Sequence, residues 1–188
     1  YPVPALPCVP GLEGAGVAAE VIAPFMGEAM PPQDLRELLA RAYAPFRHPA
    51  TAPLVQTGPN DFILELFHGP TLAFKDFAMQ VLAPLMERAL ERRGDRAAII
   101  AATSGDTGGA AVEAFRDRAR IDLFVLHTEG RTSEVQRKQM KTVDAANVHN
   151  IAVRGNFDDA QAIVKALFND HGFRDAHRLV AVNSINWA

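Results

Sequence analysis

The chain has 188 residues, of which 48% are hydrophobic and 22% are charged, and its formal net charge is −3 at pH 7. This composition is typical of a globular protein with a core, and disorder is not expected. Without a basic excess, binding to a nucleic-acid backbone is not expected. No apolar run reaches the roughly 20 residues of a membrane span, so a membrane partner is not expected either.

The sequence contains a single cysteine, Cys8. An intramolecular disulfide and a cysteine-based zinc site are therefore excluded. This cysteine usage agrees with a reducing compartment, and the expected location is the cytoplasm. The chain starts at Tyr1 inside a proline-rich stretch, without the layout of a signal peptide, so we expect it to be a piece of a longer protein.

The first sixty residues are expected to form a small, mainly helical region with a connector. Prolines are too dense in residues 1–11 for a helix or a central strand, which indicates an extended segment. Apolar residues recur at helical spacing over residues 17–26 and 32–43, and Pro32 suits the first turn of the second helix. The segment 48–53 is expected to be a loop near a domain boundary.

Residues 61–188 alternate between strand and helix patterns. A strand is predicted at 61–67 and a long amphipathic helix at 74–94, with basic residues near its end. Further strands are predicted at 97–102, 121–127, 147–153 and 178–183. Three helices are predicted between them: a small-residue helix that ends at about residue 119, one near 132–142 and one near 157–169. Alternation at this spacing predicts an α/β fold with a parallel sheet.

The first segment that could carry out chemistry is ELFHGPTLAFKDF, residues 65–77, in which Lys75 lies near the start of a predicted helix. Phe74 and Phe77 flank it, and an amine against apolar walls loses solvation of its charged form and becomes nucleophilic. The positive end of the helix dipole acts in the same direction. A surface lysine paired with Asp76 is the alternative that the local pattern leaves open.

The second segment is ATSGDTGGAA, residues 101–110, which follows a predicted strand and opens a helix. Its hydroxyls and unhindered backbone N–H groups at a helix N-terminus suit a carboxylate or a phosphate. Asp106 would repel such an anion unless it faces another donor. The spacing fits neither a Walker loop nor the esterase pattern, and a well-capped helix with close-packed glycines remains the alternative.

The third segment, EGRTSEVQRKQM, spans residues 129–140 and precedes a predicted helix. Thr132 or Ser133 as the N-cap, with Gln136 completing a capping box, explains much of its pattern. An anion site that uses Arg131 is the second possibility. The six histidines show no metal-ligand spacing, so no metal site is predicted, although His68 adjoins the lysine segment.

Taken together and in this order, ELFHGPTLAFKDF and ATSGDTGG resemble the threonine synthase family. EGRTSEVQ and the tail VNSINWA are also similar to that family, and LPCVPGLEGAG is similar to the front of its bacterial and fungal branch. The resemblance implies the fold of the tryptophan synthase β group, known as fold type II. It also implies pyridoxal 5'-phosphate as the cofactor and conversion of O-phospho-L-homoserine and water to L-threonine and phosphate.

The resemblance assigns roles residue by residue. Lys75 matches the lysine that carries the cofactor as a Schiff base and serves as general base. Asp106 matches a residue that faces the cofactor ring, with Phe74 and Asn183 expected nearby. The residues matching the substrate carboxylate loop are Thr103, Ser104, Gly105 and Thr107. Arg131 and Ser133 are the candidates for the substrate phosphate, and Asn186 has no assigned role.

The resemblance covers well under half of a family member, and the loop for the cofactor phosphate is expected further along the chain. Residues 1–60 are expected to belong to the N-terminal helical region and 61–188 to the first part of the catalytic domain. The sequence does not fix the oligomeric state, for which a monomer is the expectation. The alternatives are another fold type II lyase, such as a serine or threonine dehydratase, and a non-catalytic relative that binds phosphate ligands.

Overall fold

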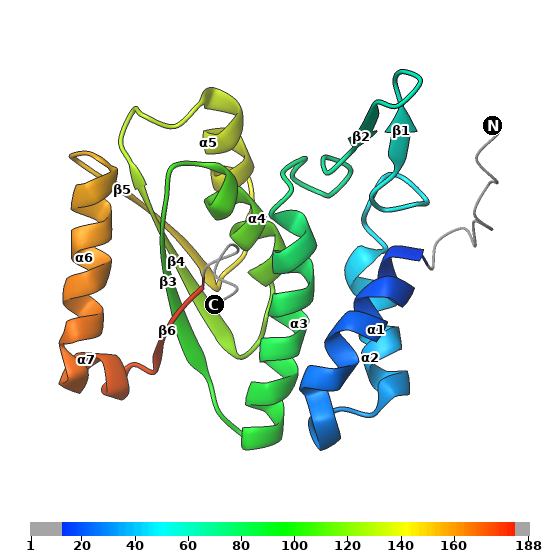
Figure 1. Cartoon of the computed structure of the whole chain (residues 1–188). Helices are drawn as coiled ribbons and strands as arrows, with labels where there is room; N and C mark the ends of the chain where they lie inside the picture. Colours follow the sequence, from blue (N-terminus) through cyan, green and yellow to red (C-terminus); the bar gives the residue numbers. More distant parts are fainter. Residues whose placement is uncertain (1–12, 183–188) are drawn as a thin grey trace. The chain divides into compact units, whose positions relative to one another are not determined.

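The computed structural model describes residues 13–182, which form two compact units divided between Phe77 and Ala78 (Figure 1). The connector predicted for residues 1–11 and Cys8 lie outside the described residues. The division falls in the first turn of a helix, α3, which spans Asp76–Arg93. Each unit is described by itself.

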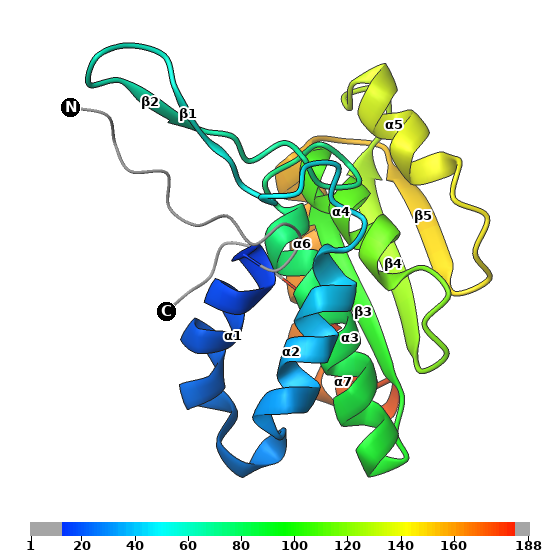
Figure 2. The same ribbon diagram turned by 90° about the vertical axis from the view of Figure 1, so that its right-hand side faces the viewer.

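The first unit begins with two helices that the sequence predicts. These are α1 (Glu13–Met26) and α2 (Pro32–Tyr43), joined by a short 3-10 turn, η1 (Gly27–Ala29), and Figure 2 shows α1 beside α2. The buried residues of α2 recur at three and four positions, as one face of a helix requires: Leu35, Leu38, Leu39 and Ala42. The expected helical N-terminal region is confirmed.

A two-stranded antiparallel sheet completes the secondary structure of the first unit. It pairs β1 (Leu54–Gln56) with β2 (Phe62–Leu64) in the register Val55↔Ile63. The strand predicted within residues 61–67 is confirmed for Phe62–Leu64, but it pairs with β1 in an antiparallel hairpin and not with the parallel sheet. An apolar run does not specify its partner, and the turn at 57–61, closed by Thr57 N–H to Asp61 O at 2.9 Å, brings a near neighbour in sequence to it.

The second unit is a four-stranded parallel sheet in the order β5-β4-β3-β6. Its strands are β3 (Ala97–Thr103), β4 (Ile121–Thr128), β5 (Val148–Val153) and β6 (Leu179–Ala181). The helices between them are α4 (Asp106–Phe115), α5 (Glu134–Lys141), α6 (Phe157–Asn169) and α7 (His171–Ala176). The predicted parallel α/β sheet is confirmed, and α7 is an additional short helix.

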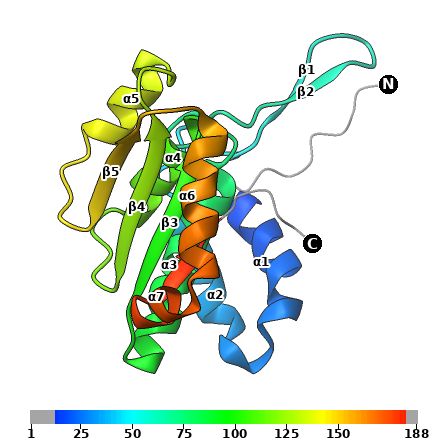
Figure 3. The same cartoon turned by 90° about the vertical axis from the view of Figure 1, so that its left-hand side faces the viewer.

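Alternate residues of the central strands supply two cores on opposite faces of the sheet. Ile99 and Leu123 pack with buried residues of α4 and α5 and with the part of α3 that belongs to this unit. Ile100 and Leu126 point to the other face and pack with Ala160 of α6. Figure 3 shows α6 covering that face, with α4 behind the sheet. The period of two along each strand thus sets the three layers.

Candidate functional site

Lys75 lies in the first unit, in the turn directly before α3. Its side chain is half-buried, and Nζ lies 5.8 Å from the centre of the Phe74 ring. The predicted position of Lys75 near a helix start and beside an aromatic ring is confirmed. Phe74 itself is half-exposed, so one side of this neighbourhood is open.

A buried carboxylate holds the turn that carries Lys75. Asp76 has 0% of its surface exposed, and it accepts hydrogen bonds from Thr71 N–H at 2.8 Å and from Thr71 Oγ1–H at 2.7 Å. A side chain at Gly69 would overlap the Asp76 carboxylate, so only glycine fits there. Asp76 therefore fixes the backbone from Gly69 to the lysine.

Burial raises the pKa of the Asp76 carboxyl above its ordinary value, because the charged form loses hydration. Hydrogen bonds from the Thr71 side chain and from the backbone of Thr71, Ala73 and Leu72 oppose that rise. The Asp76 carboxylate is thus bound by the loop that precedes α3, through its two hydrogen bonds from Thr71.

His68 shares this segment with Lys75. Its Nε2 lies 2.7 Å from Glu65 Oε2, and its ring contacts those of His48 and Phe67. The His68 carbonyl also accepts a hydrogen bond from Arg47 N–H at 2.8 Å. His68 thus connects Glu65, which follows β2, to the segment before β1 through its Nε2 and its carbonyl oxygen.

The second predicted segment forms the connection from β3 to α4 in the second unit. Thr103 is 1% exposed, and its Oγ1 accepts hydrogen bonds from Gly105 N–H at 3.0 Å and from Gly108 N–H at 2.8 Å. The hydroxyl thereby satisfies a first-turn donor of α4 that the helix cannot satisfy itself. Thr103 thus holds the loop from its buried side, while Ser104 is exposed at the surface.

Two glycines in this loop are required by its geometry. Gly105 has a φ of 153°, and a side chain there would overlap that of Gln136. A Cβ at Gly108 would lie 2.5 Å from Thr103 Cγ2 and 2.7 Å from Met140 Sδ. The close packing offered as one explanation of the glycines is therefore real, and it brings α4 against β3 and α5.

Asp106 faces a donor, as an anion site in this loop would require. Gln136 Nε2 donates to Asp106 Oδ1 at 2.7 Å. Gln136 also completes the predicted capping box: its backbone N–H donates to Ser133 Oγ at 3.2 Å, and its Oε1 accepts from Ser133 N–H at 3.2 Å. One side chain thus links the α4 loop to the start of α5.

The remaining predicted site residues are Arg131, Ser133, Thr107, Asn183 and Asn186. Arg131 and Ser133 are exposed in the turn before α5, and the Ser133 hydroxyl serves as the N-cap acceptor. Thr107 lies in the first turn of α4 and is half-buried. Asn183 and Asn186 lie outside the described residues.

The sequence interpretation missed the coupling role of Gln136 beyond its capping box, and it missed a cluster around His127. Gly105 and Gln136 are far apart in the sequence and follow no regular spacing, so their contact could not be predicted from the sequence. For His127 the signal was present: it ends a strand, and the following helix carries basic residues four apart at Arg137 and Lys141.

Over residues 13–182, no cluster of three or more histidine, cysteine, aspartate or glutamate side chains is arranged to hold a metal ion. Within the same range, none of the helices combines the length and apolar character needed to cross a bilayer.

The second unit combines a parallel sheet with a glycine-rich loop, and the first unit carries a lysine directly before a helix. The chain belongs to the family described as pyridoxal-phosphate dependent enzyme, whose model matches residues 51–188. The expected α/β fold of that family, preceded by a helical region, is confirmed by this match and by the solved structures below.

Among curated proteins, the chain is similar to the threonine synthase of Pseudomonas aeruginosa, with 52% identity over 178 residues, 95% of this chain and 38% of that protein. Among solved structures, it matches the pyridoxal-phosphate-bound threonine synthase of Brucella melitensis with a TM-score of 0.88 and 53% identity, covering 95% of this chain and 39% of that one. Yeast threonine synthase matches with a TM-score of 0.85 and 41% identity, over 94% and 37% of the two chains. The chain therefore spans less than two fifths of the length of these relatives, and the resemblance to threonine synthase is confirmed.

Proposed function

We propose that the whole protein containing this chain converts O-phospho-L-homoserine and water to L-threonine and phosphate, as a carbon–oxygen lyase of threonine biosynthesis that uses pyridoxal 5'-phosphate. The observation that carries the proposal is the position of Lys75. Lys75 lies directly before α3, in a loop that the buried Asp76 holds in place by accepting hydrogen bonds from Thr71. The 52% identity to a threonine synthase supports the choice of substrate.

The residues present fit the cofactor by their chemistry. A primary amine on a fixed turn suits its aldehyde, and Lys75 offers one beside the Phe74 ring. In the second unit, the Asp106 carboxylate is oriented by Gln136 and is exposed, which suits a polar ring substituent. We infer that Lys75, Phe74, Asp106 and, in the tail, Asn183 contact the cofactor. When bound, the cofactor supplies an electron sink for the carbanion formed at the substrate α-carbon.

The β3–α4 loop supports recognition of the substrate carboxylate. Ser104 presents an exposed hydroxyl, and Gly105 and Thr107 lie at the positive end of α4, which stabilises a carboxylate. Thr103 supports the loop through its hydrogen bonds to Gly105 and Gly108. In the overall reaction, phosphate leaves the γ-carbon and the water oxygen is added at the β-carbon.

Lys75 is the group of this chain that is proposed to move protons. Its amine would take the proton from the α-carbon and return protons at later stages. Arg131 and Ser133 are proposed to contact the substrate phosphate from the turn before α5. Water must be kept from the site until the β-carbon is ready, and closure of the protein around the substrate would achieve this.

The arrangement of the whole protein is also a proposal. We infer that residues 1–60 belong to an N-terminal region and residues 61–188 to the first part of the catalytic domain. The net charge of −3 and the single cysteine support a cytoplasmic enzyme without a nucleic-acid or membrane partner. A monomer is proposed as the oligomeric state.

The test is turnover by the full-length protein loaded with the cofactor. Phosphohomoserine should yield threonine and phosphate in equal amounts, while serine and threonine should yield little ketoacid. Lys75→Ala should abolish threonine formation, and Lys165→Ala, on α6, should leave it unchanged. Ketoacid from serine as the main product would favour a dehydratase, and the absence of any turnover by the loaded protein would contradict the proposal.

A further inference from the structure

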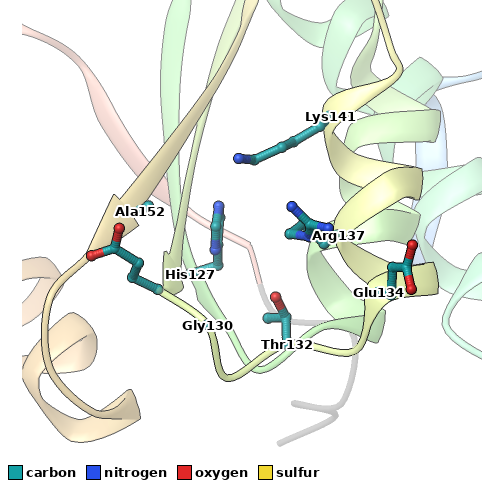
Figure 4. Close-up of a pocket in the computed structure, with 8 residues that line it drawn as sticks. His127, Gly130, Thr132, Glu134, Arg137, Lys141 and Ala152 are labelled. Atoms are coloured by element: carbon teal, nitrogen blue, oxygen red, sulfur yellow. The ribbon is translucent and has the colours of Figure 1, made fainter.

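A second polar site lies in the second unit, at the carboxyl ends of β4 and β5. A cavity of about 430 Å³ opens there between the strand ends and α5 (Figure 4). His127 reaches it from β4, Thr132 from the following loop, and Arg137 and Lys141 from α5. The carboxyl ends of parallel strands are where open α/β sheets bind ligands.

Two buried polar atoms in this cavity have no hydrogen-bond partner among residues 13–182. One is Nε2 of His127, a residue that is only 3% exposed, and the other is Oγ1 of Thr132. The other ring nitrogen of His127, Nδ1, lies 3.5 Å from the Thr128 carbonyl oxygen. Buried polar atoms are nearly always paired in proteins, so two unpaired ones facing one cavity indicate a polar ligand.

The charges around the cavity identify the sign of that ligand. Arg137 and Lys141 are one helical turn apart, and Figure 4 shows both side chains directed toward His127. Neither forms an ion pair within the described part of the chain. The two acidic residues of the lining are already engaged, because Glu134 binds Lys138 at 2.8 Å and Glu129 binds Arg154 at 3.4 Å.

We propose that this cavity binds a phosphate group. Two cations match the charge of a phosphate dianion, and the Arg137 guanidinium presents the forked donors that suit phosphate oxygens. The Thr132 hydroxyl supplies a further donor, and so does His127 Nε2 in the tautomer that carries its hydrogen there, in which Nδ1 does not donate to the Thr128 carbonyl oxygen 3.5 Å away. This site lies one turn further along α5 than the pair Arg131 and Ser133. Binding does not depend on the proposed function, whereas the source of the phosphate does.

Isothermal titration calorimetry of the full-length protein with inorganic phosphate measures the affinity of the site and requires no turnover. The double variant Arg137→Gln and Lys141→Gln should lose at least tenfold in affinity. Lys165→Gln, which removes one exposed lysine of α6 that does not line the cavity, should stay within twofold of the native protein. Equal affinity in the double variant, an equal loss in Lys165→Gln or the absence of saturable binding would overturn the proposal.

A nitrogen NMR spectrum of the histidine side chains locates the bound phosphate. Phosphate should shift the Nε2 resonance of His127 and leave that of His149, an exposed histidine stacked on Phe124, unchanged. A shift at both rings, or at neither, would contradict the assignment.

Turnover kinetics then identify the source. If the phosphate belongs to the substrate, the double variant should raise KM for phosphohomoserine and weaken inhibition by inorganic phosphate in parallel. If KM is unaffected while calorimetric binding is lost, the occupant is a separate phosphate-bearing ligand. Because calorimetry needs no activity, failure of the proposed reaction would leave the binding result intact.

Discussion

Replacing Thr103 with valine isolates the hydrogen bonds that shape the β3–α4 loop. Valine has nearly the shape of threonine but cannot accept the two bonds from Gly105 N–H and Gly108 N–H, both of which are buried. Thr103→Ser is the matched control, because it keeps the hydroxyl and removes only the buried methyl group.

The structure sets the size of each effect. A buried donor left without a partner costs about 1–3 kcal/mol, so two of them should lower the free energy of unfolding by about 2–6 kcal/mol in Thr103→Val. Removing one buried methyl group in Thr103→Ser should cost about 1 kcal/mol. The valine variant is therefore expected to be the less stable of the two, although it preserves the packing.

Urea unfolding followed by circular dichroism provides the assay, with the slope of the transition checked for constancy. Calorimetric affinity for the substrate should fall in Thr103→Val and be nearly retained in Thr103→Ser, since only the former frees the loop. A valine variant as stable as the serine variant would refute the assignment of Thr103 Oγ1 as the acceptor that organises this loop.

Two further predictions concern the turn before Lys75 and the loop at Gly105. In Asp76→Asn, an amide group meets backbone donors, and stability at pH 7 should fall by about 1–3 kcal/mol. Because burial raises the pKa of Asp76, the folded carboxyl binds a proton at a higher pH than the unfolded one. The native protein should therefore gain stability relative to Asp76→Asn as pH falls through that raised pKa toward the ordinary 3.8, with no further gain below it. Urea unfolding at a series of pH values measures the difference in free energy of unfolding between the two proteins. A difference that shrinks with falling pH would contradict the burial effect. Gly105→Ala should cost about 1–3 kcal/mol through its φ and its overlap with Gln136. In a double-mutant cycle with Gln136→Ala the penalty should become smaller, and strict additivity would show that the overlap is unimportant.

Local patterns in the sequence were sufficient for most of the fold. The helix at 32–43 matches the structure at both ends, because Pro32 fixes its start and its apolar residues share one face. The parallel sheet followed from the strand and helix alternation after residue 97. The β1–β2 hairpin could not be predicted, because β2 has the same apolar character as a sheet strand and only tertiary pairing distinguishes the two.

The candidate site shows the same limit. The glycine loop and the capping box at Ser133 could be predicted, because both are set by residues a few positions apart. The bond between Gln136 and Asp106 joins residues thirty apart, and the bonds of Asp76 to Thr71 depend on how a loop folds back. Such contacts have no sequence period, and the sequence offered no reason to separate His127 from the other histidines, because the residues around it come from other elements.

The covalent role of Lys75 is the central claim, and borohydride reduction of the cofactor-loaded full-length protein tests it most directly. Mass spectrometry of the digested protein would locate the pyridoxyl adduct among all lysines, with Lys138, Lys141 and Lys165 as internal controls within this chain. The structure predicts one adduct, at Lys75, and loss of visible cofactor absorbance in Lys75→Ala but not in Lys165→Ala. A stoichiometric adduct at another lysine, or full absorbance in Lys75→Ala, would contradict the assignment.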